Sequence, residues 1–357
     1  MTEVYLNRIA TAVPDHDVHA SFIEFATTLL QTERERALFR RMVERCDIDH
    51  RFSVLPAAPR GSNVGPEKNG FFKPGAFPST AARMRVYEQG APELAARALD
   101  RLALGGEARK ITHILVVSCT GFMAPGLDQW VARHLGLPSS VERTVVGFMG
   151  CAAGLNALKL ARHIVRSEPT ARVLVLSLEL CTLHLHEDAD LQQLLSFLIF
   201  SDGCAAAIVS REPAGLALDG FASMVVPDTL PLITWNIGDQ GFDMMLSGKV
   251  PATVRGAVRG SVERILGTSG ANGIEHWAVH PGGRSILDAV EQALALPASA
   301  LALSRGVLRD FGNMSSATIL FVLQRLLAAR HPAGAPGCAM AFGPGVAAET
   351  MTFRLAA

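Results

Sequence analysis

The chain has 357 residues, of which 49% are hydrophobic and 18% are charged, a balance that excludes a disordered polypeptide. Lysine and arginine together number 33, as do aspartate and glutamate, so the net charge is zero and no nucleic-acid-binding surface is expected. The most apolar stretch, residues 194–209, is interrupted by serine, aspartate and glycine, which argues against a membrane span. The length fits two domains or one large duplicated unit.

The cysteines indicate a cellular compartment. They are scattered and form no Cys-x-x-Cys pair, and the first residues carry an early acid without the long apolar run of a secretion signal. We therefore expect reduced thiols and a cytoplasmic protein. The six residues are Cys46, Cys119, Cys151, Cys181, Cys204 and Cys338.

The first hundred residues are predicted to be helical and connecting segments. Residues 21–45 are amphipathic and highly charged, and residues 88–104 return to helical periodicity. Between them, residues 53–80 contain five prolines and several glycines, which predicts an irregular excursion. Long loops of this kind in compact proteins are often functional.

From residue 112 onward, strands and helices alternate. Apolar runs rich in Val, Leu and Ile predict strands, and the segments between them have helical periodicity. This order predicts an α/β protein with a central sheet. The expected strands are 113–119, 144–148, 172–180, 204–210 and a segment near Phe221, and the expected helices are 126–135 and 152–166.

The second half of the chain repeats this plan in outline. GIEHWAVHPGG (273–283) resembles KITHILVVSCTG (110–121): a polar lead-in and a histidine precede an apolar strand and a glycine-bearing turn. We therefore expect two related α/β halves, residues 1–212 with the nucleophilic cysteine and residues 213–357. The further expected elements are helices 284–294 and 314–329 and strands 338–343 and 350–355.

Cys151 is the strongest candidate nucleophile. It follows a predicted strand and Gly150, and it opens a helix of small residues. The unpaired N–H groups and the positive dipole at a helix start stabilise a thiolate. A buried structural cysteine is the ordinary alternative, but the glycine and alanines around Cys151 favour a reactive group.

Two further polar residues follow apolar segments. His280 ends a strand before Pro-Gly-Gly, and a neutral imidazole there could take the proton of Cys151 to give a thiolate–imidazolium pair. Asn313 precedes a helix, where it is either an N-cap or an amide donor to an oxyanion or enolate.

Taken in order, GFMGCAAG around Cys151, HPGG from His280 and GNMSSAT around Asn313 resemble the signatures of type III polyketide synthases, the relatives of chalcone synthase. AFGPG near the C-terminus resembles the family's GFGPG loop, with Ala341 in place of the first glycine. SCTGFMAPGLD resembles the segment that reaches the dimer partner, and LIFSDGCAAAIV resembles the Phe-x-Asp-Gly stretch. The resemblance covers nearly the whole chain and is closer to bacterial members than to plant members.

The resemblance implies a thiolase fold, with a duplicated five-layer αβαβα core, and a homodimer. It implies that Cys151 carries the acyl group from an acyl-CoA starter, and that His280 and Asn313 promote decarboxylation of malonyl-CoA. No metal or cofactor is implied. The substrate-binding residues that it implies are Phe200 and Phe242 between the CoA tunnel and the cavity, Arg41 and Arg45 at the CoA phosphates, and Ser315, Gly343 and Pro344.

Two residues depart from the family pattern. His184 falls, by its spacing from Phe200, at a cavity position where relatives carry small residues, so we expect its imidazole to narrow the cavity or to add a polar group to it. The alternative is a buried histidine that holds the strand by hydrogen bonding. Cys119 falls near another cavity position, where it is either a second thiol or an inert wall residue. His184, His186, Glu187 and Asp188 could also be read as metal ligands, but no third ligand cluster accompanies them.

The predicted reaction is a decarboxylative Claisen condensation, followed by cyclisation to an alkylpyrone, an alkylresorcinol or a related phenolic product. The alternatives are a ketoacyl-carrier-protein synthase III-like condensing enzyme, whose His-Gln-Ala-Asn pattern fits less well, and a non-catalytic acyl-CoA-binding protein. The sequence leaves open the starter, the number of extensions and the mode of ring closure.

Overall fold

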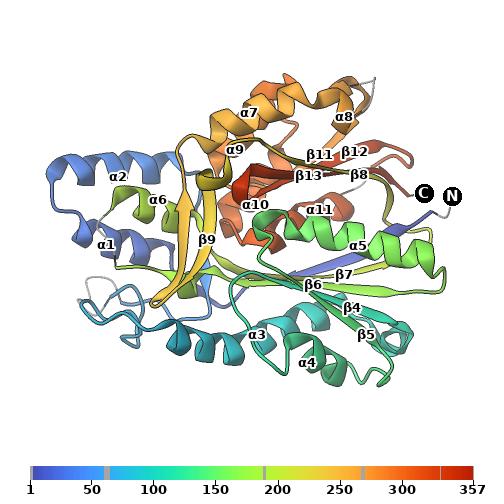
Figure 1. The fold of residues 1–357 in the computed structure, drawn as a ribbon, viewed down its shortest axis with the longest axis horizontal. Helices are drawn as coiled ribbons and strands as arrows, with labels where there is room; N and C mark the ends of the chain where they lie inside the picture. Colours follow the sequence, from blue (N-terminus) through green and yellow to red (C-terminus); the bar gives the residue numbers. More distant parts are fainter. Residues whose placement is uncertain (1–2, 60–64, 188–189, 267–269, 330, 357) are drawn as a thin grey trace.

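The computed structural model describes residues 3–59, 65–187, 190–266, 270–329 and 331–356, and its main feature is a large twisted sheet (Figure 1). The strand order of this sheet is β11-β12-β13-β8-β1-β7-β6-β4-β5. Its strands are β1 (Tyr5–Ala12), β4 (His113–Ser118), β5 (Glu142–Gly147), β6 (Val173–Leu180), β7 (Asp202–Ser210), β8 (Leu216–Val225), β11 (His276–Val279), β12 (Pro336–Gly343) and β13 (Ala347–Leu355).

The sheet consists of two parts joined at a narrow seam. Strands β6, β4 and β5 are parallel, while β1 and β7 pair antiparallel beside them. In the other part β11 and β12 are parallel, and β12, β13 and β8 are antiparallel. Only Tyr5↔Ala217 and Leu6↔Leu216 pair β1 with β8 across the seam. The expected division at residues 212 and 213 falls in the loop between β7 and β8, and the independence of the two halves stays a prediction.

Helices cover the outer faces of both parts and fill the space between them (Figure 1). Helices α3 and α4 cover the outer face of the first part, α5 and α11 lie between the two parts, and α7 and α9 cover the second. The helices are α1 (His19–Leu29), α2 (Glu33–Arg45), α3 (Thr80–Leu102), α4 (Leu127–His134), α5 (Ala153–Ser167), α6 (Leu191–Ile199), α7 (Val250–Gly260), α8 (Val262–Leu266), α9 (Arg284–Leu294), α10 (Ala302–Phe311) and α11 (Thr318–Ala328). This layering confirms the predicted α/β thiolase-type architecture.

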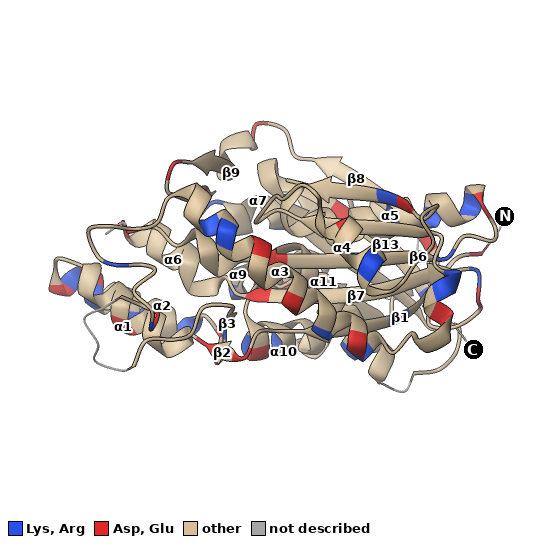
Figure 2. Cartoon of the chain, turned by 90° about the horizontal axis from the view of Figure 1, so that it is seen from below, with Lys and Arg blue, Asp and Glu red and all other residues tan. Residues whose placement is uncertain are grey.

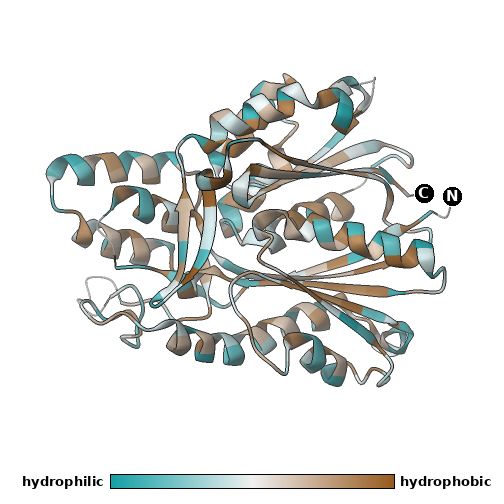
Figure 3. Cartoon of the chain, viewed as in Figure 1, coloured by the Kyte–Doolittle hydropathy of each residue, from teal (hydrophilic) through white to brown (hydrophobic). Residues whose placement is uncertain are grey.

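The alternation of side chains along the strands explains the layers. On β6, Leu174 and Leu176 enter the cluster beneath α3, whereas Val173 and Val175 enter the central cluster around α5 and α11. A strand that is apolar at every position therefore buries both faces, as expected for a sheet covered by helices on both sides. Figure 3 shows the central strands largely in brown, the hydrophobic end of the scale.

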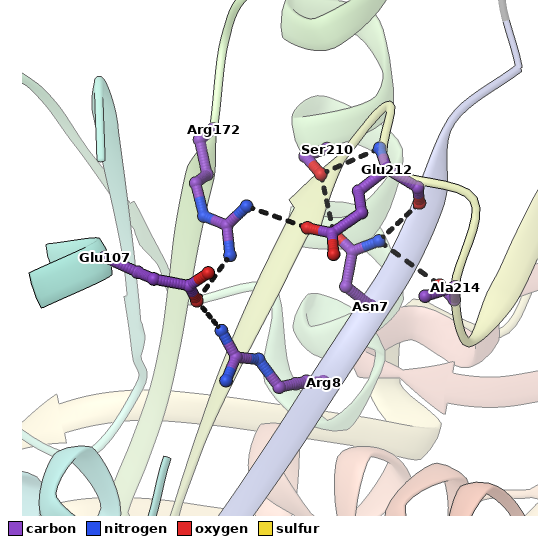
Figure 4. Close-up of polar contacts among 7 residues, drawn as sticks. All are labelled: Asn7, Arg8, Glu107, Arg172, Ser210, Glu212 and Ala214. Atoms are coloured by element: carbon purple, nitrogen blue, oxygen red, sulfur yellow. Dashed lines mark hydrogen bonds and ion pairs between the residues drawn. The ribbon is translucent and has the colours of Figure 1, made fainter. Parts of the chain in front are cut away.

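A polar network ties the strand ends near the seam (Figure 4). Glu107 contacts Arg8 of β1 and lies 3.2 Å from Arg172, which pairs at 3.0 Å with Glu212 in the loop after β7. The Asn7 amide donates to the Glu212 carbonyl at 2.7 Å. Because these carboxylates and guanidiniums share partners, the network links β1, β6 and the β7–β8 loop.

The N-terminal third differs from the sequence prediction. Strand β1 lies in the middle of the sheet although no strand was expected there, and the segment 21–45 is divided into α1 and α2. Thr32 and Glu35 form a capping box that starts α2, and Ser79 caps α3, which begins eight residues before the expected start at residue 88. Helices α6 and α10 and the hairpin of β9 (Ile233–Gly238) and β10 (Gly241–Leu246) were not predicted.

The irregular excursion is confirmed where the structure describes it. After the short strand β3 (Phe52–Ser53), which pairs with β2 (His16–Asp17), no helix forms in residues 54–59 or 65–79. Acidic and basic residues are interspersed along the chain (Figure 2). Within the described ranges, no helix is both long enough and apolar enough to span a bilayer.

Candidate active site

A buried cavity lies where several strands of both parts end. Cys119 follows β4, Cys181 follows β6 and Cys151 lies shortly after β5, whereas His280 follows β11 and Gly343 ends β12. All five residues line the cavity. The carboxyl ends of parallel strands are the usual binding edge of α/β sheets, and here two such edges face each other.

The turn that presents Cys151 has an unusual backbone. Phe148 and Gly150 adopt positive φ angles of 56° and 62°, and a 3-10 turn over Gly150–Ala152 leads into α5. A Cβ atom at Gly150 would lie 2.4 Å from Cδ of Pro344, so only glycine fits against the loop after β12. The positive φ at Phe148 is costly for a bulky residue, and such strain concentrates at functional sites.

Cys151 lies beside Asn313 and Ser315. Its Sγ is 4.0 Å from Oδ1 of Asn313 and 3.7 Å from Oγ of Ser315. Burial raises the pKa of Cys151 to about 11, and the nearby Glu179 carboxylate also raises it, while the side-chain interactions with Ser315 and Asn313 oppose the shift. The thiol form therefore predominates at neutral pH, although the helix start had predicted a stabilised thiolate.

His280 shares the cavity with Cys151, but no hydrogen bond joins them among the described residues. The side chain is 1% exposed, and neither ring nitrogen has a hydrogen-bond partner. Burial lowers the pKa of His280 to about 3, so the ring is neutral. The expected thiolate–imidazolium pair is absent from this state, and instead a neutral imidazole offers unoccupied donor and acceptor atoms to the cavity.

Hydrogen bonds orient the Asn313 amide. Its Oδ1 accepts from the Ser315 backbone N–H at 2.8 Å and from Oγ1 of Thr318 at 3.4 Å. Because a backbone N–H can only donate, Oδ1 must face it, and Nδ2 turns toward the His280 loop, 3.4 Å from the Gly282 carbonyl. The amide therefore faces the thiol with Oδ1, and its donor Nδ2 lies beside the loop that follows His280.

The sequence analysis missed Glu179, which lies beneath the site. This carboxylate accepts from the Cys119 N–H at 2.9 Å and from Oγ1 of Thr120 at 2.7 Å, and Ser316 also donates to it. Burial raises the pKa of Glu179 to about 7, although these hydrogen bonds oppose the shift. A single acid within the apolar run VLVLSLEL was the signal that could have identified it.

Most of the other predicted residues line the same cavity. Phe200, Ser315, Gly343 and Pro344 are on its wall. Cys119 also lines it, and its Sγ accepts from the Gly150 N–H at 3.2 Å, so this thiol supports the nucleophile turn. Burial raises the pKa of Cys119 well above its usual range, which favours the inert-wall interpretation.

His184 and Phe242 lie behind the wall rather than on it. Nε2 of His184 donates to the Thr120 carbonyl at 2.7 Å and Nδ1 accepts from the Phe242 N–H at 3.0 Å, while the two rings stack at 4.1 Å. The expectation that His184 narrows the cavity is wrong, because both ring nitrogens are used in holding the backbone. Met244 lies two residues after Phe242 on the same face of β10. It lines the cavity where Phe242 was expected to do so.

The remaining candidates are dispersed. Arg41 and Arg45 are exposed on α2 and do not line the cavity. His186 lies 3.3 Å from Asp243, whereas the Glu187 carboxylate accepts a hydrogen bond from the Gly75 N–H. These two suggested metal ligands therefore have different partners. Asp188 lies outside the described residues. In the described part of the chain, three possible metal ligands converge only at His113, Glu142 and Glu168, where β4 and β5 begin.

The protonation state of Cys151 can be measured by alkylation. Because the pKa of this thiol is about 11, its rate of reaction with iodoacetamide should rise about tenfold per pH unit from pH 7 to 9. Peptide mapping by mass spectrometry separates Cys151 from the other thiols, and Cys151→Ala identifies its signal. A rate that is already constant above pH 7 would instead indicate a standing thiolate–imidazolium pair.

His184 is predicted to be a structural residue. His184→Ser leaves the Thr120 carbonyl and the Phe242 N–H without partners, so the free energy of unfolding should fall by about 2–4 kcal/mol. Urea unfolding measures this loss, and His16→Ser, at an exposed histidine, is the matched control with an expected change below about 0.5 kcal/mol. Equal stability of the two variants would contradict the assignment.

Comparison with known proteins agrees with this site. Residues 4–213 match the N-terminal domain, and residues 218–356 the C-terminal domain, of the chalcone and stilbene synthases. The chain is 32% identical over 357 residues to a 1,3,6,8-tetrahydroxynaphthalene synthase of Streptomyces peucetius subsp. caesius, covering 97% of this chain and 92% of the relative. It is 34% identical over 287 residues to an alpha-pyrone synthesis polyketide synthase-like protein of Mycobacterium tuberculosis, covering 76% of this chain and 73% of the relative.

Solved structures show the same architecture. The crystal structure of 1,3,6,8-tetrahydroxynaphthalene synthase from Streptomyces coelicolor superposes with a TM-score of 0.87 at 29% identity, covering 99% of each chain. A polyketide synthase of the brown alga Ectocarpus siliculosus gives a TM-score of 0.89 at 28% identity, with 99% of each chain covered. From its matched domains, its relatives and its cavity, the chain belongs to the chalcone and stilbene synthase family and is a type III polyketide synthase, an acyltransferase-type enzyme.

Proposed function

We propose that this enzyme transfers an acyl group from an acyl-CoA to Cys151 and extends it by decarboxylative condensation with malonyl-CoA. The observation that carries the proposal is that the Cys151 thiol shares one cavity with the oriented Asn313 amide and with His280, whose two buried ring nitrogens have no hydrogen-bond partner among the described residues. Buried polar groups normally have partners, so these two ring nitrogens indicate a place for a polar substrate atom.

The chemistry uses these groups in sequence. The sulfur of Cys151, after losing its proton to His280, attacks the thioester carbonyl, and CoA leaves as the thiol after taking up a proton. The carbon–carbon bond to the malonyl carboxylate then breaks, carbon dioxide leaves, and His280 and Asn313 donate hydrogen bonds to the resulting enolate oxygen. The enolate carbon attacks the acyl thioester and releases the Cys151 thiolate, which takes up one proton from solvent to restore the thiol. These steps balance without a cofactor, and none is proposed.

The cavity lining supports an apolar starter. Ile233, Trp235, Met244 and Leu246 come from the β9–β10 hairpin and Val250 from α7, so this part of the cavity wall is mostly apolar. A product of the alkylpyrone, alkylresorcinol or related phenolic type agrees with such a lining. Relatives named for α-pyrone synthesis and for tetrahydroxynaphthalene synthesis give further support.

Arg41 and Arg45 are proposed to bind the CoA phosphates. Both guanidiniums are exposed on α2, and the Arg45 carbonyl accepts from Arg284, at 3.5 Å, where α9 begins. The loop before α9 contributes Gly282 to the cavity, so the end of α2 lies beside an edge of the site. Guanidiniums suit phosphate recognition because they donate two parallel hydrogen bonds.

The proposal is tested by incubating the enzyme with malonyl-CoA and acyl-CoA starters of graded length and identifying products by mass spectrometry. Cys151→Ala should form no acyl-enzyme and no product. Asn313→Ala should still load the acyl group but lose malonyl decarboxylation by about 10²–10³-fold, since an amide donor cannot act as the base for the thiol. His280→Ala should impair both steps.

Equal loading defects in the Asn313 and His280 variants would contradict this division of roles. Failure of the wild-type enzyme to release CoA from any starter would reject the proposed substrates. Turnover only with carrier-bound malonyl groups would instead favour a ketoacyl-carrier-protein synthase III-like substrate preference.

The enzyme is also proposed to be a homodimer in the cytoplasm. Strand β5 is an unpaired edge of the sheet, and exposed Phe122, Val145 and Met149 lie on or near it, with exposed fractions of 46%, 53% and 45%. A second copy of this chain would cover both the edge and its apolar side chains. All six cysteines are free thiols, which agrees with a reducing compartment.

Sedimentation should give a species of about twice the 38.0 kDa chain mass at micromolar concentration. Val145→Glu places a charge on the apolar face and should shift the protein toward the monomer, because a buried unpaired carboxylate is costly. Lys110→Glu, away from these apolar residues on an exposed turn, serves as the control. A monomeric wild type would reject the dimer.

A further inference from the structure

Arg51 is a buried cation outside the catalytic group. It lies just before β3, is 2% exposed, and stacks at 4.6 Å over the ring of Phe22 in α1. Its Nε donates to Nδ1 of His19 at 3.0 Å, and its Nη1 donates to the carbonyls of Phe197 at 2.7 Å and Phe200 at 2.8 Å. Its Nη2 is buried and has no hydrogen-bond partner in the described part of the chain.

Through its hydrogen bonds to the Phe197 and Phe200 carbonyls, Arg51 caps the C-terminal end of α6. The last carbonyls of a helix lack partners within the helix and carry the negative end of its dipole, so a cation placed there is favourable. Burial lowers the pKa of Arg51 to about 10, which leaves the guanidinium charged at neutral pH. Nη1 bridges the last turn of α6, at Phe197, to the extended segment that follows at Phe200.

Helix α6 forms part of a wall between two cavities. A second cavity, lined by Phe22, Leu55 and Phe72 among others, lies next to the reaction cavity. Phe197, Phe200 and Cys181 line both cavities, and these three residues are called the partition. Arg51 lines the second cavity, whose wall is otherwise mostly apolar.

The two ends of the partition are held differently. The segment at Phe200 is tied to the catalytic strand edge, because the Asn313 N–H donates to the Ile199 carbonyl at 2.8 Å and the Ser201 N–H to the Asn313 carbonyl at 2.9 Å. The Phe197 carbonyl, in contrast, bonds to Arg51 in the last turn of a nine-residue helix. Loss of Arg51 would therefore release the turn that carries Phe197 before it disturbs Asn313.

We propose that Arg51 is a positioning residue that holds the partition of Phe197, Phe200 and Cys181 closed, and that the second cavity accepts the end of a longer apolar acyl chain when this partition opens. This inference rests on the proposed acyl-CoA starter. The enzyme's preference for starters of a given length would then depend on the Arg51 guanidinium, which contacts neither the reacting atoms nor the reaction cavity.

The test compares Arg51→Met with the wild-type enzyme in kcat/KM for hexanoyl-CoA and for dodecanoyl-CoA. Methionine fills much of the same space but cannot donate to the two carbonyls. Because each buried methylene changes preference by about fourfold, entry of two or three into the second cavity should raise the dodecanoyl-to-hexanoyl ratio at least tenfold. Phe197→Ala, which thins the partition directly, should shift the ratio in the same direction with Arg51 intact.

Arg162→Met is the matched control. Arg162 in α5 is also buried, with its guanidinium donating to the carbonyls of Leu218 and Asp219, and neither Arg162 nor these acceptors line either cavity. Its loss should lower stability by a similar amount and leave the ratio unchanged. Arg51→Lys, which keeps the charge but cannot reproduce the guanidinium geometry, should give a smaller rise than Arg51→Met.

An unchanged ratio in both Arg51→Met and Phe197→Ala would overturn the proposal, and so would an equal rise in Arg162→Met, which would indicate general loosening. If Arg51→Met does not fold, Arg51→Lys and Phe197→Ala decide the outcome by the same ratio. A wild-type enzyme that turns over neither starter would reject the proposed function instead of this inference.

Discussion

Exclusion of water from the inner end of the cavity sets the protonation states on which the chemistry depends. Burial raises the pKa of the Cys151 thiol to about 11 and lowers the pKa of the His280 ring to about 3, so both groups are neutral near pH 7. A neutral imidazole and an amide can stabilise an enolate by hydrogen bonding, and such bonds are stronger where the effective dielectric constant is low. The same burial disfavours a standing thiolate, so deprotonation of Cys151 belongs to acyl loading.

A second consequence of burial concerns the support beneath the nucleophile. The Glu179 carboxylate is tolerated there because three donors, from Cys119, Thr120 and Ser316, approach it. These bonds join the end of β4, strand β6 and the turn after Asn313. Glu179 therefore links the segment that carries Cys119, strand β6 and the turn that carries Asn313. Because the pKa of Glu179 is about 7, this carboxyl group also gains a negative charge near Cys151 as the pH rises through 7.

How far the sequence predicts this protein depends on which interactions are local. The strands beneath the cavity and helix α9 follow from runs of apolar residues, and Cys151, His280 and Asn313 stand out because they interrupt or end such runs. His184 could not be placed, because its direction depends on hydrogen bonds to Thr120 and Phe242, which lie 64 and 58 residues away in sequence. Strand β1 was missed for a similar reason: its stability comes from β7, far along the chain.

The four residues from Phe200 to Gly203 show how a short motif can organise both cavities. The Phe200 carbonyl accepts from Arg51, Oγ of Ser201 accepts from the Phe52 N–H, and the Asp202 carboxylate accepts from the N–H groups of Val54 and Thr182. A Cβ at residue 203 would lie 2.4 Å from the Met314 sulfur, so only glycine lets β7 approach the turn after Asn313.

Each of the four residues from Phe200 to Gly203 therefore contacts a different segment of the chain. Asp202 is fully buried, and burial raises its pKa to about 7 while its hydrogen bonds oppose that shift, so its backbone donors stabilise the charged form. The segment connects the irregular N-terminal excursion to the catalytic asparagine through main-chain and side-chain bonds. A change in the loop after β3 can thus reach the reaction cavity by displacing the backbone that carries Phe200, without contact between that loop and Cys151.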